Sequence, residues 1–227
     1  MNATVNTPLF PLIRHLSKFA TPVFMRLPVS ANMITTASMV TGLAAAWCVT
    51  LGTPGADIAA GALFVITYIL DNCDGEIARL KDQCSTFGMR FGSFVDWVVH
   101  TALFAGLGIG AAARFDNELW FWMGMVAAAG GTINYILLFI LDARDKAAAE
   151  SEEEWAAGKT GETYHVPEGL SDWALHIFRE LTRADFCFIV LALAVFDVTW
   201  VLVPAGAIGF QVYWITQFAQ GANDFHV

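Results

Sequence analysis

Long apolar blocks are the feature of this sequence that most constrains its fold. They lie at residues 33–51, 56–78, 91–113, 117–141, 183–197 and 199–219. A helix needs about 20 mostly apolar residues to cross the roughly 30 Å hydrocarbon core of a bilayer. The last two blocks must share their length with a tight turn near residues 197–200. The pattern therefore predicts an all-α integral membrane protein with six transmembrane helices.

The composition excludes several other classes of protein. Of the 227 residues, 56% are apolar and only 15% are charged, whereas soluble domains are about 25% charged. The chain thus lacks the charged surface of a soluble globular domain and the polarity of a disordered one. Its net charge of −9 and the lack of a large basic patch argue against nucleic acid as a partner. The four cysteines form no CxxC pair, so no zinc or redox motif is visible.

Two segments outside the blocks complete a single membrane domain over residues 1–227. Residues 10–27 are too short and too charged to span a bilayer, and they predict an amphipathic helix at the membrane interface. The four blocks within 33–141 follow. Residues 142–172 carry nine acids against three basic residues, and we interpret them as a solvated cytoplasmic loop. The last two blocks occupy 183–219.

The basic residues predict the orientation of the spans. With the amino terminus in the cytoplasm, eleven of the twelve lysines and arginines lie on that side, and Arg114 is the exception. An even number of spans then places the carboxyl terminus in the cytoplasm as well. We expect an integral protein of the bacterial cytoplasmic (inner) membrane.

Small residues recur at helical spacing in the third and fourth blocks. Gly106 and Gly110 are four residues apart, and Gly124 begins a similar series. Small residues let helix backbones approach closely in membranes. We interpret the series as close packing within one bundle, and a seam between two copies of the chain stays open as an alternative.

The chemically informative residues lie where the second block meets the cytoplasm. On a helix, Asp71, Asp74, Gly75 and Ala78 share one stripe. Burying an acid in a membrane costs about 2.5–3.5 kcal/mol, and a hard divalent cation would offset this cost because carboxylate oxygens suit Mg²⁺, Mn²⁺ or Ca²⁺. Gly75 and Ala78 leave room beside the acids for a phosphate chain. Arg79 adds a permanent positive charge for phosphate oxygens.

Asp96 lies inside the third block, and an acid within a span is a functional candidate by default. If the third helix packs beside the second, Asp96 can complete a metal site or act as a general base. His100 lies one turn further along, and we interpret it as a satisfied polar residue of the bundle.

The stretch from residue 70 to residue 100 resembles the signature of the CDP-alcohol phosphatidyltransferases. That pattern is D-x-x-D-G-x-x-A-R, eight residues, G, three residues, D, three residues, D. Its matching positions here are Asp71, Asp74, Gly75, Ala78, Arg79, Gly88 and Asp96. The segment PVSANMITTASMVTGL is similar to the Pro-Asn-x-x-Thr start of the family's first span. One position departs, because Gly92 stands where the third aspartate belongs.

The resemblance implies a role for each matching residue. Asp71 and Asp74 would be metal ligands, and Asp96 would be both a ligand and the catalytic base. The cofactor implied is Mg²⁺ or Mn²⁺, as one or two ions. Gly92 removes one expected ligand, which a water could replace. The CDP contacts implied are Asp71, Asp74, Gly75, Ala78, Arg79 and Gly88.

The function implied is metal-dependent transfer of a phosphatidyl or phospho-alcohol group from a CDP-alcohol to an acceptor hydroxyl. CMP is released, and the product is a phospholipid or a related polar lipid. We expect CDP-diacylglycerol as the donor, with a soluble CDP-alcohol open as an alternative, a small alcohol as the acceptor and membrane lipid around the chain. A homodimer is possible. Basic residues that could bind an acceptor phosphate, or simply mark the cytoplasmic side, are Arg90, Arg144, Arg179 and Arg183.

Two alternatives stay open. Because of Gly92, the chain could be a weakened or inactive member of the family that binds a CDP-lipid without turnover. It could also be an ion or proton transporter that uses its intramembrane acids. The clustering of these acids at one interface, without a matching polar path on the far side, disfavours transport.

Overall fold

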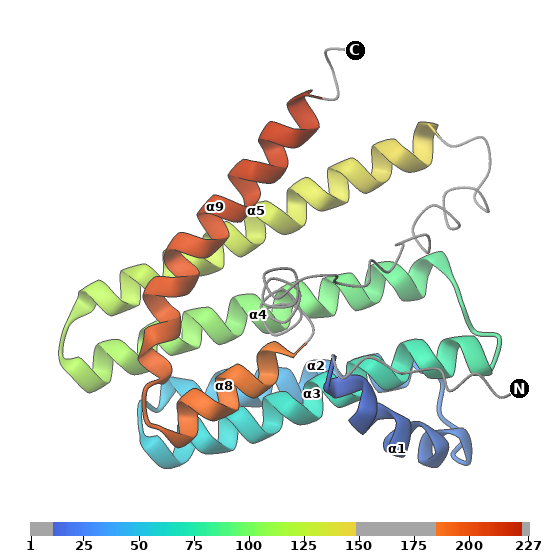
Figure 1. Ribbon diagram of the computed structural model, residues 1–227, viewed down its shortest axis with the longest axis horizontal. Coiled ribbons are helices and arrows are strands. Elements are labelled where there is room, and N and C mark those ends of the chain that lie inside the picture. Colours follow the sequence, from blue (N-terminus) through green and yellow to red (C-terminus); the bar gives the residue numbers. More distant parts are fainter. Residues whose placement is uncertain (1–10, 149–184, 224–227) are drawn as a thin grey trace, which may run out of the picture.

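The structure is a computed structural model that describes residues 11–148 and 185–223. Within these ranges the chain is helical and contains no strand (Figure 1). The elements in chain order are α1 (Ile13–Met25), α2 (Ala31–Thr50), α3 (Pro54–Leu80), α4 (Thr86–Phe115), α5 (Glu118–Ala148), α8 (Phe186–Val195), the 3₁₀ helix η1 (Thr199–Val201) and α9 (Leu202–Asn223).

Four of these helices, α2, α3, α4 and α5, are long and apolar enough to cross a membrane. The described α8 has ten residues, which is about 15 Å of helix and half of a bilayer core. The apolar part of the last segment, Thr199–Ile215, is also shorter than a full span. The all-α fold is therefore confirmed for the described residues, which include four candidate membrane spans, and the count of six stays a prediction. The placement of α1 in the membrane interface also stays a prediction.

Two boundaries differ from the sequence prediction. The helix expected from residue 91 begins at Thr86, because the Ser85 hydroxyl accepts a hydrogen bond from the Gly88 amide at 3.0 Å and caps the first turn. Gly88 therefore lies on α4, as does Gly92 within the predicted block. Helix α5 continues to Ala148, so the segment expected as an acidic loop over 142–172 begins as helix. The rest of that segment lies outside the described residues.

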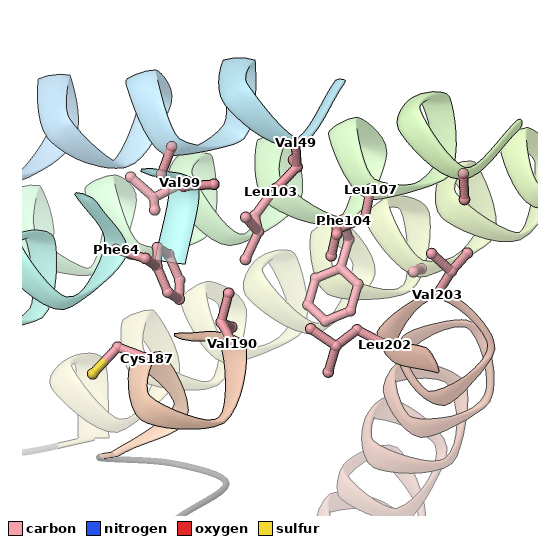
Figure 2. Close-up of a cluster of buried hydrophobic side chains, with 14 of the residues drawn as sticks. Val49, Phe64, Val99, Leu103, Phe104, Leu107, Cys187, Val190, Leu202 and Val203 are labelled. Carbon is pink, nitrogen blue, oxygen red and sulfur yellow. The ribbon is translucent and has the colours of Figure 1, made fainter. Parts of the chain in front are cut away.

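The helices pack in a continuous arrangement around α4. Helix α2 contacts both α3 and α4, α5 packs on α4, α9 packs on α5, and α8 packs on α3. Figure 1 shows α5 and α9 running obliquely to α2, α3 and α4. Buried apolar side chains from α2, α3, α4, α8 and α9 form one core, in which Figure 2 shows Val49, Phe64, Leu103, Val190 and Leu202.

Glycines allow the closest contacts around α4. A Cβ atom on Gly110 would lie 2.0 Å from the Val49 carbonyl oxygen, and one on Gly108 would lie 2.7 Å from the Cα atom of Gly124. Real Cβ atoms do not approach that closely, so α2 and α5 reach α4 by backbone contact. The expected role of the small residues, close packing within one bundle, is confirmed at these contacts.

A polar clasp closes the end of the bundle away from Asp71. The tight turn expected near residues 197–200 is present, and Asp197 adopts a positive φ of 58° there. Both oxygens of Asp197 accept hydrogen bonds from Arg114 of α4, at 2.6 and 2.5 Å. Next to this pair, the Thr199 hydroxyl donates to Asp57 of α3 at 2.6 Å. The clasp therefore joins α3 and α4 to the turn that precedes α9.

Helix α1 is held at the other end of the bundle, where the signature residues of α3 lie. Its first backbone amides, those of Leu12 and Ile13, donate to the Asp185 carboxylate at 2.7 and 2.9 Å. Its buried hydroxyls on Ser17 and Thr21 donate to the two oxygens of Glu76, at 2.9 and 2.5 Å. Because Glu76 lies between the signature residues of α3, α1 packs directly on the helix that carries them.

Candidate functional site

The candidate site begins with Asp74 near the carboxyl end of α3. The buried hydroxyl of Thr35, in the first turns of α2, donates to Asp74 Oδ2 at 2.5 Å. This contact fixes one oxygen of the carboxylate against α2 and leaves the side chain partly exposed. Thr35 is a site residue that the sequence analysis did not assign. The Pro-Asn-x-x-Thr similarity contains it and was the available signal.

Asp71 of α3 interacts electrostatically with Asp96 of α4. The Asp71 carboxyl lies within electrostatic range of both Asp96 and Asp74. Asp71 is partly buried, whereas Asp96 is exposed and lines a pocket between α4 and α5. Asp71 is therefore within electrostatic range of both other acids, and Asp96 is the one of the three that lines the pocket.

Arg79 folds back along α3 toward these acids. A Cβ atom on Gly75 would lie 3.5 Å from Nη1 of Arg79, so the guanidinium passes beside the open face of that glycine. Arg79 is exposed, and its charge acts favourably on Asp74. An exposed guanidinium over a residue without a side chain is a suitable place for phosphate oxygens.

Two further signature residues lie on different helices, Ala78 on α3 and Gly88 on α4. A Cβ atom on Gly88 would lie 3.2 Å from the Ser85 hydroxyl oxygen and 3.5 Å from Asn32 Oδ1, so this part of α4 faces the first turn of α2. Ala78 is partly buried and packs against a small apolar cluster that includes Ile34. The signature residues thus surround the start of α2.

His100 connects α4 to α3 through both of its ring nitrogens. Nδ1 lies 2.8 Å from the Asp96 backbone carbonyl, and Nε2 lies 2.9 Å from the Tyr68 hydroxyl. A carbonyl oxygen only accepts, so Nδ1–H donates to it and Nε2 accepts from Tyr68. The interpretation of His100 as a satisfied polar residue is confirmed by these bonds. It braces the turn that carries Asp96, and Tyr68 is a second residue that the sequence analysis missed.

Gly92 lies one turn before Asp96 on α4. A Cβ atom built on Gly92 would meet nothing within 4 Å. The position where the family pattern has an aspartate is therefore open space, and packing does not require glycine there.

The acidic side chains of the site suit a metal ion that is also bound by the phosphates of a nucleotide better than a metal ion held by protein ligands alone. No three His, Cys, Asp or Glu side chains in the described ranges lie closely enough to hold a metal ion. Mg²⁺, however, is commonly held by one or two carboxylates together with waters and substrate phosphates. Asp71 and Asp74 provide such carboxylates beside a place for phosphates.

A pocket of about 880 Å³ opens beside Asp96, between α4 and α5. Figure 1 shows these helices diverging from their connecting turn toward the start of α4 and the end of α5. Its polar lining residues include Asp96 and Thr101 from α4 and Asn134 from α5. Thr101 and Asn134 were not found from the sequence, since neither belongs to a motif.

The predicted acceptor arginines are only partly brought to this pocket. Arg90 lines it, with the guanidinium carbon 5.7 Å from the centre of the Phe139 ring. Arg144 is exposed near the end of α5. Arg179 and Arg183 lie outside the described residues.

Comparison with known protein families agrees with this geometry. The family described as CDP-alcohol phosphatidyltransferase matches residues 28–209 of the chain. The matched range begins just before α2 and ends within α9, so it contains every signature residue and every residue that lines the pocket except Phe210. No curated protein matches the chain. Because the family match covers most of its length, the chain belongs to the CDP-alcohol phosphatidyltransferase family.

Proposed function

We propose that this chain transfers a phospho-alcohol group from a CDP-alcohol to an acceptor hydroxyl and releases CMP. The family supports transfer from a CDP-alcohol in a membrane. The observation that carries the proposal is the grouping of Asp71 and Asp74 from α3 with Asp96 from α4, at the edge of a pocket. One side of this grouping suits a diphosphate, and the other has space for an acceptor.

The donor diphosphate would bind along α3. Arg79 would donate hydrogen bonds to phosphate oxygens in the open space beside Gly75, which no side chain obstructs. Gly88 would leave similar space on α4. Asp71 and Asp74 would hold Mg²⁺ or Mn²⁺, which when bound neutralises phosphate charge and polarises the phosphorus for attack. Thr35 would keep Asp74 oriented toward that position.

Asp96 would act as the general base. Its carboxylate accepts the proton of the acceptor hydroxyl, and the oxygen attacks the phosphorus that carries the alcohol group. The bond from this phosphorus to the bridging oxygen breaks, and CMP leaves with the electron pair. A new phosphodiester forms, and the proton passes from Asp96 to solvent. The exposure of Asp96 to the pocket supports this role.

The proposal includes CDP-diacylglycerol as the donor, because its acyl chains can stay in the bilayer while the diphosphate reaches the ends of α3 and α4. It also includes cytoplasmic termini, a bacterial cytoplasmic membrane and a homodimer, which remain predictions. The apolar helices α2 to α5 support an integral membrane protein.

The direct test is CMP release by the purified protein in lipid nanodiscs with Mg²⁺, CDP-diacylglycerol and a panel of acceptor alcohols. We expect release that requires an acceptor and stops when EDTA is added. Asp96→Asn should lower kcat by at least about a hundredfold, which is the scale of general-base catalysis. Asp116→Asn, an exposed position at the far end of α4, is the matched control and should retain activity. Absence of CMP release with every acceptor contradicts the proposal.

Gly92 favours a second candidate function. A family member that lacks one carboxylate could bind the CDP-lipid without turning it over. In that case the wild-type chain would bind CDP and release no CMP, whereas Gly92→Asp would create activity. The open space at position 92 makes the substitution sterically feasible.

A further inference from the structure

The connection between α1 and α2, residues 26–30, is held by Lys81 at the end of α3. The Nζ atom of Lys81 donates hydrogen bonds to three backbone carbonyls in and just before this connection, those of Phe24, Leu27 and Val29, at 3.3, 3.0 and 2.9 Å. An ammonium group has three protons, and these three carbonyls account for all of them. Lys81 therefore ties the end of α1 and the connection to the helix that carries the signature.

Gln83 holds the first residue of α2. The side-chain oxygen of Gln83 accepts a hydrogen bond from the backbone amide of Ala31 at 2.8 Å. The first amides of a helix have no partner within the helix, and Ala31 is buried, so an unpaired amide there would be unfavourable. The position at which α2 begins is thus set by a side chain that follows α3.

A turn at the end of α3 directs both side chains to this segment. Asp82 has a positive φ of 53°, and the Gln83 amide donates to the Ala78 carbonyl at 2.8 Å. This backbone bond closes the helix in the manner of a Schellman motif. Because Ala78 is a signature residue, the turn that carries Lys81 and Gln83 is anchored on the signature itself.

A short series of contacts leads from Gln83 to the Asp74 carboxylate. Thr35 lies one turn after Ala31 on α2, and its hydroxyl oxygen is 3.1 Å from the Ala31 carbonyl oxygen and 2.5 Å from Asp74 Oδ2. Hydrogen bonds between two oxygens span about 2.5–3.0 Å, so a shift of the start of α2 by about 1 Å would break the contact with Asp74. The position of Ala31 therefore decides whether Thr35 can orient Asp74.

The place of Lys81 in the sequence, two residues after Arg79, would also suit a phosphate ligand. Its contacts argue against that role, because its three protons are already donated to backbone carbonyls. Arg79 is exposed, and its guanidinium passes beside the open face of Gly75. The two cations thus have different tasks, and only Arg79 is placed to meet a diphosphate.

We propose that Lys81 and Gln83 are positioning residues of the donor site, which hold the start of α2 so that Thr35 orients Asp74 toward a divalent cation. This rests on the proposed function, in which Asp74 binds Mg²⁺ together with the diphosphate of the donor. Neither residue contacts the diphosphate. Their effect on the site passes through the hydroxyl of Thr35.

Binding of Mg²⁺ and CDP can be followed without turnover by thermal unfolding of the full chain in lipid nanodiscs. A ligand that binds only the folded state raises Tm, so Mg²⁺ is titrated at a fixed excess of CDP. We expect Lys81→Met and Gln83→Leu each to raise the half-maximal Mg²⁺ concentration by about threefold to tenfold, the scale of a hydrogen bond. Gln83→Glu retains an acceptor oxygen for Ala31 and should behave like the wild type. Lys18→Met, at an exposed position of α1, is the matched control.

The coupling of these residues to Thr35 separates positioning from general stability. If Lys81 and Gln83 act through the Thr35 hydroxyl, their substitution in a Thr35→Val background should change the half-maximal Mg²⁺ concentration by less than about twofold, because coupled residues have non-additive effects. Residues that only stabilise the fold would give effects that multiply with that of Thr35→Val.

The outcomes separate this inference from the proposed function. Coupled effects on the Mg²⁺ dependence of Tm, without CMP release, support the positioning role and remove the transferase. CMP release with effects that multiply removes the positioning role and keeps the transferase. The inference is also overturned if Lys81→Met and Gln83→Leu lower Tm but leave the Mg²⁺ dependence unchanged, or if the wild-type Tm does not respond to Mg²⁺ with CDP.

Discussion

At the scale of single residues, the site depends on how its carboxylates are oriented. Asp74 is held by a hydroxyl from another helix, and Asp96 lies on a turn that His100 ties to Tyr68. Both supports come from residues outside the acidic signature. The structure therefore assigns positioning roles that the motif alone does not contain.

The bond between Thr35 and Asp74 gives a first prediction. Thr35→Val keeps the shape of the side chain and removes the hydroxyl, and hydrogen bonds to charged groups contribute about 1.5–3 kcal/mol. We expect kcat/KM for CMP release to fall by about tenfold or more, and the Mg²⁺ concentration needed for half-maximal rate to rise. Thr36→Val is the control, since Thr36 is exposed and bonds only within α2. An unchanged Mg²⁺ dependence in Thr35→Val would remove its positioning role.

Gly92 gives a second prediction at this scale. Gly92→Asp places a carboxylate on the same stripe of α4 as Gly88 and Asp96, in open space. An added carboxylate raises the affinity of a divalent-cation site, so we expect the half-saturating Mg²⁺ concentration to fall by about tenfold in an enzyme that is already active. Gly209→Asp, also in open space but on α9, controls for added charge. A loss of activity in Gly92→Asp would show that glycine is part of a working variant of the site.

At the scale of elements, the sequence predicted the helices that contain long apolar blocks. It did not predict the helix boundary that depends on a capping residue, or the pocket that depends on how two helices pack. The stripe of Asp71, Asp74 and Gly75 followed from helical spacing. The early start of α4 depends on the Ser85 cap, whose effect extends a helix beyond its apolar block. Thr101 and Asn134 line one pocket because α4 and α5 diverge, and no local pattern encodes that geometry.

The clasp at the far end gives a prediction about pH. Hydrogen bonds from Arg114 lower the pKa of Asp197 below its usual range. A carboxyl with a lowered pKa in the folded state contributes stability above its unfolded pKa, near 3.9, and loses it as the pH falls through the folded value. Asp197→Asn should therefore lower the Tm more at pH 7 than at pH 3.

Asparagine is suited to this substitution because it tolerates the positive φ at residue 197. Asp116→Asn is the matched control, since Asp116 also has a positive φ, of 48°. Equal effects of Asp197→Asn at both pH values would show that the turn, rather than the ion pair, accounts for the change in Tm.

At the scale of the whole molecule, α4 connects the two parts of the proposed site. It packs against α2, which also packs against α3, and it packs against α5, with which it lines the pocket. Asp96 lies on α4. The proposed transferase must bring a donor and an acceptor to one base, and a base on α4 would have the α3 acids on one side and the pocket on the other.

The orientation of the bundle gives the last prediction. Cys84 is exposed in the connection between α3 and α4. The distribution of basic residues predicts that this end of the bundle lies in the cytoplasm. Cys73 and Cys187 are buried, so they should react slowly. A membrane-impermeant maleimide should therefore leave the chain unlabelled in intact cells and label it after permeabilisation, and Cys84→Ser should abolish that labelling.

The control is Asn117→Cys in the Cys84→Ser background, at the exposed turn between α4 and α5. This cysteine should show the reverse accessibility and react in intact cells. Labelling of Cys84 in intact cells would place the carboxylates on the outer face, where cytoplasmic CDP-alcohols could not reach them.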